Sequence, residues 1–275
     1  PVQPVKPEQP TNVAPAPDTP PSAVAPQSVA PDIKIWVVIV GVASYSGINS
    51  LNYTDDDAYK MYAFYKSPEG GSLPDTQIEV LIDEDATRKN IMTALDNIYS
   101  KATEKDVIIF YFSGHGSKEA FVTHEYDGER DSNGDYKGFL LHNELHNIFD
   151  KSPAKYKYII ADACHSGSSA NKGPTGSGNA TYYRAFEQAK GGFVMLLSSM
   201  GDEVSVETRG VRQGVFSHFL IRGLKGEADT NKDRMISVIE LFEYVEPNVK
   251  RYTNNKQNPI LFGDFNDVLP ISVIK

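Results

Sequence analysis

The sequence has little of several features that would narrow its function at once. It holds one cysteine among 275 residues, which excludes an intrachain disulfide and any zinc or iron–sulfur site built from several cysteines. No apolar run approaches the roughly 20 residues that a membrane-spanning helix needs. Lys and Arg number 27 against 36 Asp and Glu, a net charge of −9. We therefore expect neither a membrane span nor a nucleic-acid partner.

The first 31 residues differ in composition from the rest. They contain ten of the 17 prolines and no aromatic residue, which favours extended, polyproline-like conformations with little apolar surface to bury. We expect a linker or tether here; the alternative is a peptide that docks on its own domain or on a partner. The chain opens on Pro1, so we expect a trimmed N-terminus. A periplasmic, secreted or cytoplasmic location would fit such a chain.

Residues 32–275 carry the pattern of an α/β domain. Continuous apolar runs suit strands buried on both faces, and apolar residues at helical spacing separate them. Strands are predicted over residues 35–42, 78–82, 106–112, 156–161 and 193–197, and helices over residues 54–65, 87–99, 214–224 and 238–249. Strands that alternate with helices indicate a mostly parallel sheet covered on both faces. The ligand site of such a sheet lies beyond the carboxyl ends of its strands.

Two motifs follow predicted strands at that edge. The third strand leads into S-G-H-G at residues 113–116, and the fourth leads into D-A-C-H-S-G at residues 162–167. Neighbouring strands lie about 4.8 Å apart, so His115 and Cys164 can meet. An imidazole beside a thiol can take its proton and make it a nucleophile. The amides of Gly116 and Cys164 could hold a developing oxyanion. The other reading is a turn histidine and a buried, inert cysteine; His165 is the rival imidazole.

The two motifs, 49 residues apart, resemble those of the caspase-like cysteine peptidases, which carry the histidine about 50 residues before Q-A-C. Asp162 stands where that signature has Gln, a departure that fits the metacaspase branch. Shorter matches accompany them: V-V-I-V-G-V, T-D-D-D-A-Y-K-M, L-L-S-S and G-V-F-S-H-F-L-I-R-G-L-K-G-E-A-D. The resemblance implies a three-layer α/β/α caspase-like fold and a thioester acyl-enzyme. It also implies a large-subunit-like part (32–170), a linker loop (168–192) and a small-subunit-like part (191–275).

The resemblance also implies cleavage after Arg or Lys. In a strand, residues i and i−2 face the same side, so Asp162 can line the pocket beside Cys164. The metacaspase pattern places the second carboxylate at Asp57, although the run of residues 55–57 allows a slip of one or two positions. Two carboxylates would bind a guanidinium or ammonium group well. The structural alternative for the Asp run is helix capping, and Asp202 and Glu203 are further candidates for acidity in the cleft.

Two further features concern processing and metal. Hydrolysis by a cysteine and a histidine needs no cofactor. Residues 229–240 nevertheless follow the register of an EF-hand calcium loop, with Arg234 at the position where such loops have glycine. The predicted ligands are Asp229, Asn231, Asp233, Met235 and Glu240. A second acidic loop, residues 127–135, has only the first half of this register. The Gly- and Ser-rich segment after Cys164 is a natural cleavage site. The candidate self-processing residues are Lys172, Arg184 and Lys190.

The sequence thus predicts a cysteine endopeptidase that is specific for Arg or Lys, self-processing and influenced by calcium. Its substrates would be peptides or proteins with a basic residue before the scissile bond. Two alternatives remain open: a catalytically silent scaffold of the same fold that acts through its Pro-rich segment, and a same-fold peptidase that prefers Asp or Asn. The presence of both His115 and Cys164 speaks against the scaffold, and the acidic cleft speaks against Asp.

Overall fold

The computed structural model describes residues 33–117, 119–130, 137–164, 192–199, 206–208 and 212–274, apart from the side chains of Cys164 and Thr208. The chain divides into two units, Pro1–Asp32 and Ile33–Lys275, and every described residue belongs to the second. Within the described part, no helix is both long and apolar enough to cross a membrane.

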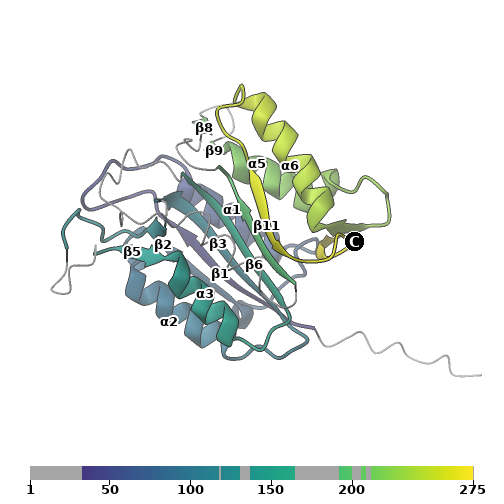
Figure 1. Ribbon diagram of the computed structural model, residues 1–275, viewed down its shortest axis with the longest axis horizontal. Coiled ribbons are helices and arrows are strands. Elements are labelled where there is room, and N and C mark those ends of the chain that lie inside the picture. Colours follow the sequence, from purple (N-terminus) through teal and green to yellow (C-terminus); the bar gives the residue numbers. More distant parts are fainter. Residues whose placement is uncertain are drawn as a thin grey trace, which may run out of the picture. The chain divides into compact units, whose positions relative to one another are not determined.

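A six-stranded sheet forms the centre of this unit, in the order β11-β7-β6-β3-β1-β2. Its strands are β1 (Ile35–Gly41), β2 (Ile78–Ile82), β3 (Val107–His115), β6 (Tyr156–Cys164), β7 (Phe193–Leu197) and β11 (Ile260–Asp264). The first five run parallel, and β11 is antiparallel to β7 at the edge. The sheet is therefore mostly parallel, as the alternating pattern predicts (Figure 1).

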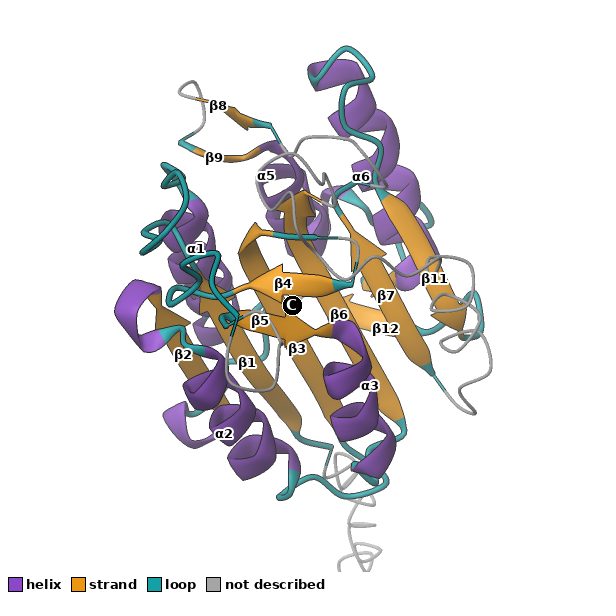
Figure 2. Ribbon diagram, turned by 60° about the vertical axis from the view of Figure 1, so that its left-hand side comes forward, coloured by secondary structure: helices purple, strands orange, loops and turns teal. Residues whose placement is uncertain are grey.

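Helices cover both faces of the sheet and give a three-layer α/β/α fold (Figure 2). One face carries α2 (Arg88–Tyr99) and α3 (His142–Lys151). The other carries α1 (Thr54–Lys66), α5 (Val215–Arg222) and α6 (Val238–Tyr252). Short pieces complete the description: β4 (Ala120–Val122), β5 (Phe139–Leu141), β8 (Glu207–Thr208), β9 (Gln213–Gly214), β10 (Met235–Ser237), β12 (Pro270–Val273), the 3-10 turns η1 (Asp75–Gln77) and η2 (Asp83–Asp85), and the π-helical turn η3 (Gly223–Glu227).

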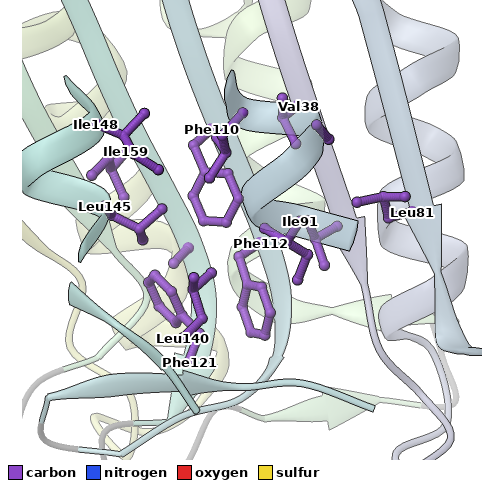
Figure 3. Close-up of a cluster of buried hydrophobic side chains, with 14 of the residues drawn as sticks. Val38, Leu81, Ile91, Phe110, Phe112, Phe121, Leu140, Leu145, Ile148 and Ile159 are labelled. Carbon is purple, nitrogen blue, oxygen red and sulfur yellow. The ribbon is translucent and has the colours of Figure 1, made fainter. Parts of the chain in front are cut away.

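The strands are apolar throughout because each of their faces packs into a separate core. Val38 and Phe110 point into the core under α2 and α3, whereas Val37 and Ile109 point into the core under α1, α5 and α6. In the first core, the ring of Phe112 stacks on that of Phe121 from β4, with centroids 4.6 Å apart (Figure 3). Burial of these apolar side chains stabilises the sheet, by roughly 25 cal/mol for each Å² of apolar surface removed from water.

The structure differs from the sequence prediction in two ways: helix α3, strand β11 and the short strands were not predicted, and several predicted elements end at other residues. Strands β3 and β6 run three residues beyond residues 112 and 161, so that they include the predicted histidine and cysteine. The expected cap of α1 at Thr54 or Asp55 is wrong: the N-cap is Tyr53, and it makes no side-chain capping bond. The Thr54 hydroxyl donates to the Val42 carbonyl instead, at 2.6 Å. Neither Thr54 nor Tyr53 therefore caps the first turn of α1 with its side chain.

Candidate active site

The ends of β3 and β6 bring the two predicted motifs into register. His115 lies opposite Cys164, and Ser113 lies opposite Asp162. Both strands are parallel and central, so these residues emerge together at the carboxyl edge of the sheet. The Cys164 side chain lies outside the described residues, and so does His165. The backbone register alone therefore brings together the residues that the sequence predicts to be catalytic.

The imidazole of His115 is oriented by the loop that follows β1. Its Nε2 lies 2.8 Å from the Asn49 carbonyl oxygen. Because a carbonyl can only accept, Nε2 must carry the proton, which makes Nδ1 the accepting nitrogen. The Tyr45 ring packs against the imidazole with centroids 4.8 Å apart. The backbone amide of His115 donates to the Tyr45 hydroxyl at 2.6 Å. Ring and backbone are thus both fixed from one loop.

Gly114, the glycine between Ser113 and His115, has no room for a side chain. A Cβ on Gly114 would come within 2.6 Å of the Tyr45 hydroxyl and 2.9 Å of the Phe112 ring, and both groups are held by the core. Any larger residue would push Tyr45 away from His115.

Burial and charge act on His115 in opposite senses. Burial lowers the pKa of the imidazole, while the Asn49 carbonyl and the charge of Glu207 act to raise it. The first effect is the largest, so the ring is neutral near pH 7 and can accept a proton through Nδ1. Near neutral pH the site therefore holds a base of the correct tautomer beside Cys164.

Two buried carboxylates lie beside this pair. Asp57 is 0 % exposed and Asp162 3 %, whereas Asp55 and Asp56 are only half-buried. Within the Asp run it is therefore Asp57 that faces inward. The Asp162 carboxylate accepts from the amide and hydroxyl of Ser217, at 3.1 and 2.7 Å.

Asp57 accepts hydrogen bonds from two other elements, β9 and β3. Its carboxylate accepts from the Gly214 amide at 3.1 Å and from the Ser113 hydroxyl at 3.2 Å. Burial raises the pKa of the Asp57 carboxyl well above its usual range, and the charge of Asp162 adds to the effect. A Cβ on Gly214 would lie 2.9 Å from an Asp57 oxygen and would overlap one from Asp162. Both carboxylates therefore pack closely against Gly214, where any side chain would displace them.

Several predicted residues fall where the structure gives no description. Asp202 and Glu203 lie outside the described residues, as do Lys172, Arg184 and Lys190. Of the second acidic loop, Asp127 pairs with Lys137 at 2.9 Å, and residues 131–136 are not described. The amide of Gly116 is placed next to β4 by an isolated bridge to Phe121.

The predicted calcium loop folds around hydrogen bonds of its own. Glu240 accepts from the Ser237 amide and hydroxyl at 3.0 Å as part of the α6 cap. Asn231 and Asp233 accept from loop amides, both at 2.8 Å. Across the described ranges, no group of three or more His, Cys, Asp or Glu is arranged to hold a metal ion. Calcium binding here stays a prediction.

Sequence reasoning missed the groups that hold the predicted residues in place. Tyr45 and Asn49 sit in a loop without a motif, and Glu207, Gly214 and Ser217 lie about 50 to 100 residues beyond the cysteine and histidine motifs in the sequence. The run G-V-F-S, which begins at Gly214, was matched only as part of a family resemblance. Nothing in its residue types indicates that it closes a pocket for carboxylates from α1 and β6.

The chain is similar to known proteins of one family. The caspase domain family matches residues 34–269. Metacaspase-4 of Arabidopsis thaliana is 28% identical over 225 residues, which cover 74% of this chain and 50% of that protein. Metacaspase-1 of Plasmodium falciparum (isolate 3D7) is 31% identical over 152 residues, which cover 48% of this chain and 24% of that protein. The chain thus spans half or less of the length of these two relatives.

Solved structures share the fold at low sequence identity. A protein of Geobacter sulfurreducens has a TM-score of 0.58 and 16% identity, covering 88% of this chain and 100% of that one. The structure of pro-sf-caspase-1 has a TM-score of 0.56 and 13% identity, covering 87% of this chain and 95% of that one. With the family match over most of its length, the chain belongs to the caspase-domain family of cysteine-type peptidases, close to the metacaspases.

Proposed function

We propose that this chain is a cysteine endopeptidase that cleaves peptide bonds after Arg or Lys, with Cys164 as nucleophile and His115 as general acid and base. The observation that carries the proposal is the register of β3 against β6, which sets His115 opposite Cys164 and Ser113 opposite Asp162. A cysteine, a histidine and an aspartate thereby lie on two neighbouring strands at one edge of the sheet.

The proposed reaction follows from the tautomer of His115. Nδ1 takes the proton of the Cys164 thiol, and the sulfur attacks the carbonyl carbon of the scissile bond. The amides of Gly116 and Cys164 are the predicted donors to the oxyanion. The imidazolium then gives its proton to the leaving amine, which leaves a thioester on Cys164. Water, deprotonated by the same nitrogen, hydrolyses the thioester and restores the thiol.

The carboxylate pair supports the proposed specificity. Asp57 and Asp162 are buried together beside the nucleophile's strand, where repulsion and desolvation make two negative charges costly. A guanidinium or ammonium group relieves both costs at once. An Asp side chain would add a third negative charge to the same place. The pair therefore favours Arg or Lys substrates over Asp.

A panel of fluorogenic peptides tests the proposal directly. Peptides that differ only in Arg, Lys, Asp or Asn before the scissile bond are incubated with the wild type and with Cys164→Ala and His115→Ala. His146→Ala is the matched control, because His146 lies on α3 and pairs with Asp150. We expect cleavage of the Arg and Lys peptides by the wild type and by His146→Ala alone. Turnover by Cys164→Ala would refute the assignment of the nucleophile, and a silent wild type would favour the scaffold alternative.

Self-processing and an influence of calcium complete the proposal. Their candidate residues are Lys172, Arg184 and Lys190 for the first, and the loop at residues 229–240 for the second. Neither is needed for the chemistry of the dyad, so each can fail while the peptidase assignment holds.

A further inference from the structure

Glu207 makes four hydrogen bonds to one short stretch of chain about 155 residues away from it. Its carboxylate accepts from the Asn52 amide at 2.9 and 3.1 Å, from the Asn52 side chain at 2.9 Å and from the Tyr53 amide at 2.9 Å. Tyr53 is the N-cap of α1 and supplies no capping bond of its own. The carboxylate from β8 therefore satisfies amides at the start of α1 that its own sequence leaves unpaired.

The stretch that Glu207 holds is the one that orients His115. Asn49, whose carbonyl accepts from the imidazole, lies three residues before Asn52. Asn49 and Asn52 are both exposed, and the core contacts of this stretch come from the neighbouring side chains of Ile48 and Leu51. The Leu51 amide ties the loop back to the Ala43 carbonyl on one side, and Glu207 ties it to β8 on the other. Loss of either tie would let the Asn49 carbonyl move.

The cross-strand pair of β8 and β9 that contains Glu207 also contacts the carboxylate of Asp57. Glu207 is paired directly with Gly214, and the Gly214 amide donates to Asp57. One cross-strand pair thus contacts this region at two points, just before and at the start of α1 and at Asp57, the buried carboxylate of the Asp run. We propose that Glu207 is a positioning residue for His115, which holds the loop at residues 49–53 so that the Asn49 carbonyl fixes the imidazole, and which links this loop to the Asp57 pocket.

The charge of Glu207 gives this role a measurable signature. Among the described residues, the Tyr45 ring and the Asn49 carbonyl from the loop after β1 contact the His115 ring, and the charge of Glu207 from β8 acts on it. Cys164 of β6 lies opposite His115 in the strand register. Glu207 brings a negative charge that favours the imidazolium. Removal of that charge should therefore lower the pKa of His115, and a loosened Asn49 carbonyl would act in the same direction. A purely structural role would lower stability and leave this pKa where it is.

The test uses the full chain with Glu207→Gln, Glu207→Asp and Glu207→Ala. Glu144→Gln is the matched control, since Glu144 likewise accepts from a backbone amide at a helix start, that of Leu141 at 3.1 Å. Histidine NMR signals are titrated in each protein, and the His115 signal is identified by its loss in His115→Gln. We expect a lower His115 pKa in Glu207→Gln, partial recovery in Glu207→Asp and no change in Glu144→Gln.

Peptide hydrolysis supplies the second readout, which rests on the proposed peptidase function. We expect kcat/KM on an Arg peptide to fall about 10-fold or more in Glu207→Ala, because a small misplacement of a catalytic group is costly. The limb of the pH profile that belongs to His115 should move to lower pH in Glu207→Gln. An unchanged His115 pKa in all three variants would overturn the inference. A shifted pKa in a chain that cleaves nothing would keep it and refute the peptidase function instead.

Discussion

Replacing Asp162 by Asn removes one charge from the carboxylate pair and nearly keeps its shape. The Asp162 oxygen that bonds Ser217 can be replaced by the Asn carbonyl oxygen, so both hydrogen bonds to Ser217 can persist. The side chain is 3 % exposed, so water has little access to the site and cannot replace the favourable interaction that the lost charge makes with a bound cation. What changes is the number of negative charges that a bound Arg or Lys side chain meets.

The size of the effect follows from the burial of the pair. Truncating one partner of a buried, hydrogen-bonded charge pair costs on the order of 2–5 kcal/mol. At about 1.4 kcal/mol per tenfold, that is a loss of roughly 30-fold to several thousand-fold in kcat/KM for an Arg peptide. Asp57 remains and still attracts the cation, so we expect the lower part of this range.

The assay compares hydrolysis with alkylation of the one thiol. We expect kcat/KM on Arg and Lys peptides to fall in Asp162→Asn, while the rate at which iodoacetamide alkylates Cys164 changes little. Asp106→Asn is the matched control, because Asp106 is also buried but lies at the amino end of β3, where it bonds Lys34 and Trp36. If alkylation slows as much as hydrolysis, Asp162 supports the nucleophile and does not form the pocket, and the reasoning is refuted.

Three further predictions use other parts of the chain. Burial raises the pKa of Asp57 in the folded protein, so the folded state binds more protons than the unfolded state and loses stability as pH rises from the unfolded pKa through the folded one. Asp57→Asn should therefore flatten the fall in the free energy of unfolding at pH values above the usual range of an Asp carboxyl, and an unchanged slope would contradict the shift. Wild-type protein incubated for long periods should lose mass by self-cleavage while Cys164→Ala stays intact, most readily after Lys172 and otherwise after Arg184 or Lys190. If the loop at residues 229–240 binds calcium, Asp233→Ala should abolish the rise in melting temperature that calcium causes, whereas equal melting curves with calcium and with chelator would exclude such a site.

The strands and helices that position the site were predictable because their signals are local. Runs such as residues 35–42 are apolar without a break, since both faces of β1 pack into cores. The positions of the two motifs that carry His115 and Cys164 were predictable for the same reason: each motif follows such a run. Their extension into β3 and β6 was not, because S-G-H and D-A-C carry no strand pattern of their own. Pairing with a neighbouring strand, rather than propensity, extends them.

The support of the site could not be read from the sequence because it depends on contacts between distant segments. Glu207 accepts from the amide of Tyr53, the N-cap of α1, whereas local rules point to a cap at Thr54 or Asp55. The partner of the His115 ring is a backbone carbonyl, which any residue type at position 49 would supply. Short strands such as β4 and β8 were missed because they hold only two or three residues. Each omission concerns a group whose role depends on where the fold brings it, which its residue type alone does not indicate.

The proposed specificity pocket is built from parts of the chain on both sides of the segment between β6 and β7. Asp57, Asp162 and one donor to Asp57, the Ser113 hydroxyl, precede it in the sequence. Two further donors to the carboxylates, Gly214 and Ser217, follow it. Strand β7 pairs with β6 along its length, so the two parts share one sheet as well as one pocket. A cut between β6 and β7 would break the chain without breaking these contacts. Self-cleavage is therefore compatible with an intact pocket, and its effect on activity would have to arise from the cut segment itself.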